Sequence, residues 1–123
     1  MRKLVIAALA AALPATPLLA QSMSVSDFLA KADALQKKGP MALFSSDIAK
    51  LKTEVVNSGK QLRAEQETAL KAGRQPATCM AKKASITSAE LIAHFRAVPP
   101  ANRGVPVKAA FADLMRKKYP CRA

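Results

Sequence analysis

"ITSAELIAHFRAVPPANRGVPVKAAFADLMRKKYPC", residues 86–121, is the stretch that decides the fold. Its first helix begins with a capping box, in which Thr87 caps the helix and Glu90 reaches back to the cap. A Pro-Pro pair ends this helix, a polar loop follows, and Pro106 suits the first turn of a second helix that ends just before Cys121. Apolar residues recur at helical spacing in both: Leu91, Ile92, Phe95 and Val98, then Val107, Ala110, Phe111, Leu114 and Met115. The stretch therefore predicts a hairpin of two helices.

Two further helices are predicted upstream of this hairpin. Ser24 caps the first, which ends at the sequence Lys37-Lys38-Gly39-Pro40. The second runs from about Asp47 to Ala72 and stops at Gly73. Their apolar stripes are Val25, Phe28, Leu29, Ala32 and Leu35 in the first, and Ile48, Leu51, Val55, Leu62 and Ala69 in the second, which Ser58 and Glu65 interrupt.

Two details of this upstream region have structural consequences. Gly59, in the middle of the second helix, either bends that helix or lets another helix approach, and it costs about 1 kcal/mol relative to alanine. Residues 41–44, Met-Ala-Leu-Phe, are predicted to form a short apolar turn tucked against the core. No segment alternates polar and apolar residues long enough to form a strand. Residues 21–123 are therefore predicted to form a single all-α domain, a compact bundle of about four helices.

Residues 1–20 have the layout of a secretory signal peptide. Arg2 and Lys3 precede the apolar run Leu4–Leu13, and Ala20 offers a small residue before the cut. We therefore expect an exported protein, periplasmic or secreted.

Cys79 and Cys121 are the two cysteines of the chain. An even number of cysteines in an exported chain predicts a disulfide, which stabilises a loop of this length by roughly 3–4 kcal/mol. A catalytic or metal-binding thiol would need partners, but the chain has one histidine and no CxxC motif. One structural disulfide is therefore predicted.

The charge is strongly positive, with 20 Lys and Arg residues against eight Asp and Glu. Export would remove Arg2 and Lys3 and lower the net charge from +12 to about +10. In the periplasm the available anions are lipid headgroups, cell-wall polymers and acidic proteins, so we expect no nucleic-acid partner. The charges of the 47–72 helix form either a solvated face or a partner-binding basic face. The residues proposed for such a face are Lys52, Lys60, Arg63 and Lys71.

The chain contains few residues that could take part in catalysis or bind a metal or cofactor. His94 lies beside an apolar stripe, which favours a half-buried or surface histidine. The sequence gives no reason to select a serine and a carboxylate that would form a catalytic triad with this one histidine. The carboxylates are scattered along helix surfaces, and the chain has no glycine-rich phosphate loop. We therefore expect no catalytic residue, no metal and no cofactor, and we predict that the protein is not an enzyme.

The segment from Cys79 to Cys121 resembles a known family. A Cys opening a loop, a capped helix ending at Pro-Pro, a polar loop and the ending "FADLMRKKYPC", residues 111–121, are similar to the resistance-associated (Rap/Tai) immunity proteins of type VI secretion. That resemblance implies a compact, helical, disulfide-bonded periplasmic protein. It also implies a partner, because characterised members bind and block cell-wall amidase toxins.

Three functions stay open at this point. The leading hypothesis is a non-catalytic periplasmic binding protein, such as an immunity protein that plugs the cleft of a cell-wall toxin, with basic residues that steer an acidic partner. The alternatives are a small periplasmic stress chaperone and an electrostatic binder of anionic envelope lipid. The sequence identifies neither the partner, the binding face nor the oligomeric state.

Overall fold

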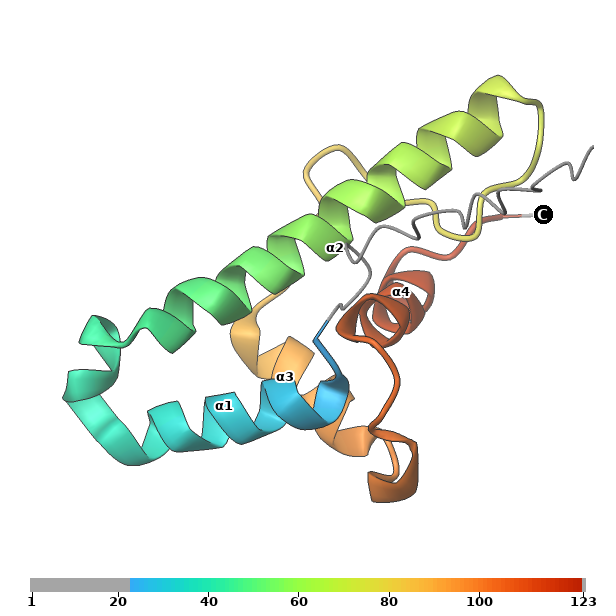
Figure 1. The fold of residues 1–123 in the computed structure, drawn as a ribbon. Helices are drawn as coiled ribbons and strands as arrows, with labels where there is room; N and C mark the ends of the chain where they lie inside the picture. The colour runs from blue at the N-terminus through green and yellow to red at the C-terminus, as the bar shows by residue number, and fades with distance from the viewer. Residues whose placement is uncertain (1–22, 123) are drawn as a thin grey trace, which may run out of the picture.

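The computed structural model describes residues 23–122 and contains four α-helices in that range (Figure 1). They are α1 (Val25–Lys38), α2 (Ser46–Lys71), α3 (Ser88–Ala97) and α4 (Val107–Lys118). Two short 3₁₀ segments join them, η2 (Gly39–Phe44) between α1 and α2, and η3 (Pro100–Asn102) between α3 and α4. The predicted all-α bundle is confirmed. The expected signal peptide, residues 1–20, lies outside the described residues.

Each helix of the α1–α2 hairpin begins at a serine cap. The side chain of Ser24 accepts a hydrogen bond from the N–H of Asp27 at 3.1 Å, and that of Ser45 accepts one from Asp47 at 3.3 Å. Gly73, with φ of 70°, follows the end of α2. The caps and stops therefore fall within a residue or two of the predicted boundaries.

The α3–α4 hairpin has the predicted geometry. Thr87 accepts a hydrogen bond from the N–H of Glu90 at 3.1 Å, and the Glu90 carboxylate accepts one from the N–H of Thr87 at 2.9 Å, so both halves of the capping box are present. Cys79 precedes α3, Cys121 follows α4, and their disulfide joins Cα atoms 5.0 Å apart. The disulfide therefore closes the open end of this hairpin, as predicted.

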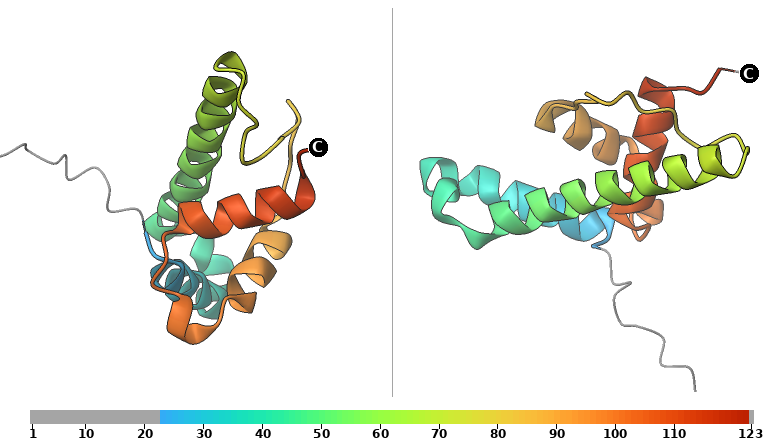
Figure 2. Two further views of the ribbon diagram at one scale, coloured as in Figure 1. Left: turned by 90° about the vertical axis from the view of Figure 1, so that its right-hand side faces the viewer. Right: turned by 90° about the horizontal axis from the view of Figure 1, so that it is seen from above.

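The core lies where α4 crosses α2 and where α3 and α4 cover the first half of α1 (Figure 2). Phe28 and Phe95 pack edge to face, with ring centroids 5.0 Å apart. Ser58, which interrupts the stripe of α2, is buried, and its hydroxyl donates to the carbonyl of Glu54 at 2.9 Å. The buried apolar residues of this core are Val25, Phe28, Leu29, Leu62, Met80, Leu91, Phe95, Val107, Ala110, Phe111 and Met115.

Gly59 lies at the contact between α2 and α4. A Cβ at this position would lie 3.8 Å from Cε1 of the Phe111 ring, so α4 passes over the glycine. Of the two expectations for Gly59, this packing shows the approach of another helix, but 3.8 Å is an ordinary van der Waals distance, so the approach does not require glycine.

The chain start is tied to the start of α4. The N–H of Val25 donates to the carbonyl of Val105 at 2.9 Å, and the N–H of Val107 donates to that of Met23 at 2.8 Å. This isolated antiparallel bridge centres on Ser24 and Pro106, and the described residues contain no longer strand.

One prediction is wrong. Residues 41–44 do not tuck against the core, because they form the turn at the far tip of the α1–α2 hairpin, which no other element of the described chain covers. Met41, Leu43 and Phe44 are 66%, 79% and 84% exposed. The apolar character of the turn gave no information on whether a neighbouring element would reach it.

Candidate functional site

An open apolar groove of about 310 Å³ lies between α1, α2 and the start of α3. A second hollow of about 420 Å³ between α1 and α3 shares Ala32 and Ile92 with it. The groove is lined by Phe28, Ala32, Leu51, Lys52, Val55, Val56, Ile86, Thr87, Ser88, Leu91 and Ile92.

The groove exists because the apolar stripes of the hairpin are longer than the elements that cover them. Val25, Phe28 and Leu29 are buried, but Ala32 and Leu35 further along α1 are only half-buried. Helix α3 has ten residues and lies beside the hairpin without reaching its tip (Figure 2). Val56, on the α2 side of the groove, is left 44% exposed. The middle of the hairpin therefore presents apolar surface that no other described element covers.

The remaining wall of the groove is the segment before α3, which α2 holds in place. The side chain of Gln66 accepts a hydrogen bond from the N–H of Met80 at 2.8 Å and donates to its carbonyl at 3.2 Å. Arg63 donates to the carbonyls of Ala81 at 3.0 Å and Lys82 at 3.2 Å. Side chains of α2 thus satisfy backbone hydrogen-bonding groups of this segment, as a neighbouring strand would do in a sheet.

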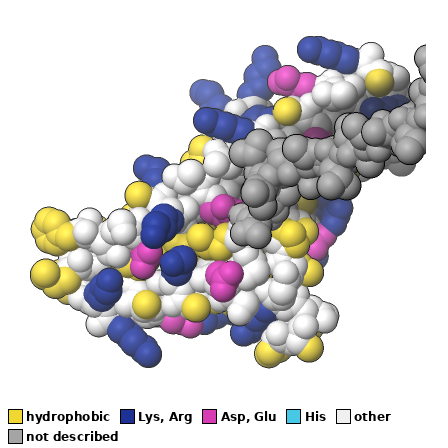
Figure 3. Space-filling view, viewed as in Figure 1, with side chains coloured by type: hydrophobic (Ala, Val, Ile, Leu, Met, Phe, Trp, Pro, Cys, Tyr) yellow, Lys and Arg dark blue, Asp and Glu magenta, His cyan; other side chains and the backbone are white. Residues whose placement is uncertain are grey.

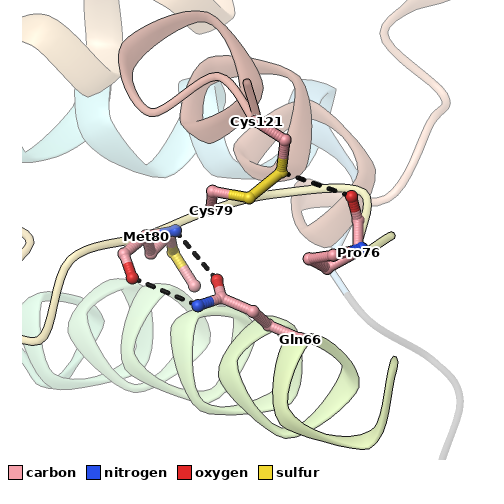
Figure 4. The surroundings of a disulfide bond; sticks show 5 residues. All are labelled: Gln66, Pro76, Cys79, Met80 and Cys121. Atoms are coloured by element: carbon pink, nitrogen blue, oxygen red, sulfur yellow. Dashed lines mark hydrogen bonds between the residues drawn. A yellow bond between two sulfur atoms is a disulfide. The ribbon is translucent and has the colours of Figure 1, made fainter. Parts of the chain in front are cut away.

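The disulfide adds a covalent tie to the same segment (Figure 4). The N–H of Cys79 donates to the carbonyl of Tyr119 at 3.2 Å, and the Cys121 Sγ contacts the carbonyl oxygen of Pro76 at 3.4 Å. That contact is not a hydrogen bond, since a disulfide sulfur carries no hydrogen. Further along, the N–H of Ser85 donates to the Tyr119 hydroxyl at 3.2 Å. These ties hold the segment that leads into Ile86 and Thr87 on the groove wall.

The electrostatic surroundings of the groove are cationic. Its lining, and that of the adjoining hollow, contain Lys52 and Arg96 but no carboxylate among the described residues. Two carboxylates of the hairpin already have cationic partners: Asp33 lies 2.5 Å from Arg96, and Asp47 lies 3.5 Å from Lys31. The hydrogen bond from Arg96 holds the pKa of Asp33 below its usual value, so this carboxylate stays ionised. The groove therefore favours an acidic ligand.

The predicted basic residues are spread along α2 rather than gathered at one point. Lys52 lines the groove, and Lys60 and Lys71 are exposed further along the helix. Arg63 is half-buried and holds the neighbouring segment through the two carbonyls named above. Figure 3 shows Lys and Arg side chains along the outer edge of α2. At 1.5 Å per residue, Lys52 and Lys71 are separated by about 28 Å along the helix axis, so they cannot contact one small ligand together.

His94 lies outside the groove, half-buried on the side of α3 that faces α4. Burial and the nearby charge of Lys117 lower the pKa of His94, although a hydrogen bond with the backbone of Ala110 opposes this effect. Within residues 23–122, no three His, Cys, Asp or Glu side chains come together as metal ligands. In the same range, every helix is too short or too polar to cross a membrane.

Sequence reasoning missed the groove, although its signal is present. The apolar stripe of α1 runs on past Phe28 to Leu35, and that of α2 begins at Ile48, which makes both stripes longer than the two short helices downstream can cover. The lining of the groove offers apolar contacts and one lysine, Lys52.

Comparisons with known proteins find no match for this chain among family models, curated proteins or solved structures. The resemblance of residues 79–121 to the immunity family therefore stays a prediction.

Proposed function

We propose that this protein is a non-catalytic, exported binding protein of the periplasm, and that its groove holds an acidic, amphipathic helix of a partner protein. The observation that carries the proposal is the uncovered apolar groove between α1, α2 and α3, whose lining, within the described part of the chain, includes Lys52 but no carboxylate. The disulfide supports an oxidising compartment outside the cytosol.

The shape of the groove favours a helix over a small molecule. Pockets for small ligands enclose most of the ligand surface, whereas this groove is open and continues into the hollow beside α3. An amphipathic helix inserts apolar side chains from one face into such a groove and keeps its other face in water. Val56 and Ile92 offer apolar contacts along this path.

Charge selects the kind of helix. Lys52 lies in the groove lining and forms no ion pair among the described residues. Acidic residues flanking the apolar face of a partner helix would pair with this lysine and would be attracted by the net positive charge of the chain.

An immunity protein that blocks a cell-wall-targeting toxin is the partner relationship that the family resemblance favours. In that case the toxin supplies the acidic helix, and occupation of the groove covers part of the toxin surface. No group of this protein has to react, which agrees with a binding role.

The proposal is tested with two synthetic helical peptides of about 16 residues, long enough to form a marginally stable helix. Both carry leucine at positions spaced i, i+3, i+4 and i+7, and the remaining positions are glutamate-rich in one and lysine-rich in the other. Fluorescence anisotropy of the labelled peptides measures the Kd for residues 21–123. We expect the acidic peptide to bind and the basic peptide not to bind.

A pair of matched variants shows whether binding takes place in the groove. Val56→Glu places a carboxylate on the groove wall, whereas Leu70→Glu makes the same change at a 58% exposed position of α2 that does not line the groove. We expect Val56→Glu to raise the Kd at least about tenfold more than Leu70→Glu does, because only the first adds a clash and a repulsion at the site. Equal effects of the two variants would reduce the binding to non-specific attraction and would contradict the proposal.

A further inference from the structure

The tip of the α1–α2 hairpin is a second apolar surface, separate from the groove. Met41, Leu43 and Phe44 of η2 are 66%, 79% and 84% exposed, and none of them belongs to the core. The tip lies at the end of the hairpin away from α4, at the far left in Figure 1, and hydrophobic side chains gather there in Figure 3. These three side chains are named the apolar tip.

The backbone presents the apolar tip as an ordered turn. Gly39 takes a positive φ of 57°, which starts the turn, and its N–H donates to the carbonyl of Gln36. The N–H of Ser45 donates to the carbonyl of Ala42 at 2.9 Å, which closes the turn before α2. In a 3₁₀ helix, residues three apart point the same way, so Met41 and Phe44 share one face. The fold therefore directs large apolar side chains into solvent while it satisfies the backbone around them.

Two lysines precede the apolar tip on its α1 side. Lys37 and Lys38, in the last turn of α1, are exposed and make no ion pair among the described residues. Asp47 is the one carboxylate between residues 37 and 52, and it lies 3.5 Å from Lys31 and 3.7 Å from Lys50. The turn and its flanks thus combine exposed apolar groups with a local excess of positive charge.

We propose that the apolar tip inserts into the surface of an anionic phospholipid membrane, with Lys37 and Lys38 on the lipid headgroups. Shallow insertion of apolar side chains, combined with attraction of Lys and Arg to anionic lipid, is a recognised mode of peripheral membrane binding. This inference is independent of the groove and concerns a different part of the molecule.

Two other occupants of the apolar tip fit the structure less well. A second copy of the chain in a two-fold dimer would bring the lysines of both copies into one interface, because such an interface uses the same patch twice. A protein partner bound at the tip alone would meet one six-residue turn, while a stable interface usually buries at least about 1,000 Å². A membrane needs no matching surface, since it offers apolar interior beneath charged headgroups over its whole area.

The first test uses the absence of tryptophan from the chain. Phe44→Trp creates a single fluorescent reporter in the apolar tip, and Leu70→Trp creates a matched reporter on α2. Each is mixed with vesicles of phosphatidylglycerol and phosphatidylcholine, or of phosphatidylcholine alone. We expect a blue shift and quenching by brominated lipid for Phe44→Trp on the anionic vesicles only. Equal signals from the Phe44→Trp and Leu70→Trp variants, or no shift in the first, would overturn the proposal.

The second test separates specific contact from overall charge. Lys37→Gln with Lys38→Gln removes two charges beside the tip, whereas Lys60→Gln with Lys71→Gln removes two from the far part of α2. In vesicle sedimentation we expect the first pair to weaken binding by about tenfold or more relative to the second, since attraction acts on charges near the lipid surface. Equal losses would show diffuse charge attraction and would reject insertion of the tip.

A third readout distinguishes the membrane from self-association. Leu43→Ser with Phe44→Ser changes exposed side chains only, and circular dichroism checks that the helices persist. We expect this variant to lose vesicle binding and to keep the sedimentation coefficient of the wild type. A concentration-dependent dimer of the wild type that this variant abolishes would assign the tip to a second copy instead.

Discussion

Replacing Gly59 by alanine is expected to stabilise this protein. Gly59 lies in the middle of α2, where glycine costs about 1 kcal/mol relative to alanine, because the more flexible residue loses more backbone freedom on folding. The nearest atoms to a new Cβ are Cε1 and Cζ of the Phe111 ring, at 3.8 and 3.9 Å. These are ordinary van der Waals distances, so the methyl group fits beneath α4 without a shift of either helix.

The expected gain is about 1 kcal/mol in the free energy of unfolding. In a domain of this size, that gain raises the Tm by roughly 4–8 °C. Urea unfolding of the mature chain, followed by circular dichroism, measures it as a higher midpoint at an unchanged m-value. An unchanged midpoint, or a loss of about 0.5 kcal/mol or more, would refute the reasoning. It would mean that α2 and α4 approach too closely for a methyl group.

Gly73→Ala is the matched control for this prediction. A Cβ at Gly73 meets nothing within 4 Å, but the residue has a φ of 70°, which is strained for alanine. We expect this substitution to lower the free energy of unfolding by about 1 kcal/mol. The same chemical change thus has opposite signs at the two positions, because one glycine is helical and the other ends the helix.

Three further predictions concern the disulfide, a cap and a histidine. Replacing Cys79 and Cys121 by serine should lower the free energy of unfolding by roughly 3–4 kcal/mol, and urea unfolding of the wild type with and without dithiothreitol should reproduce that difference; a loss below about 1 kcal/mol would contradict the role of the bridge. Thr87→Ala should cost about 1 kcal/mol by removing the α3 cap, whereas Thr87→Ser should restore most of it, as thermal unfolding will show. Because the pKa of His94 is lowered in the fold, the unfolded chain binds more protons near its ordinary pKa of 6.5, so stability should fall as the pH drops from about 7 through that value. His94→Gln should remove this part of the pH dependence, and an unchanged pH profile would argue against it.

The sequence determined the helices and their ends, because these depend on neighbours along the chain. The capping box of Thr87 and Glu90 joins residues three apart, and the serine caps of α1 and α2 act within their own first turns. Helical spacing of apolar residues likewise predicted the side of α4 that carries Phe111. The disulfide could be predicted for a different reason, since two cysteines allow one pairing.

Only the tertiary structure decided which apolar residues stay uncovered. The sequence predicts that Phe28 and Phe44 both face the core, yet Phe28 is buried against Phe95 and Phe44 is 84% exposed. The difference lies in the position of α3 and α4, which cover the first half of α1 and leave the tip of the hairpin free. The role of Arg63 was decided in the same way. Its carbonyl partners, Ala81 and Lys82, are 18 and 19 residues away along the chain, and contacts at such separations depend on how the elements pack rather than on local pattern.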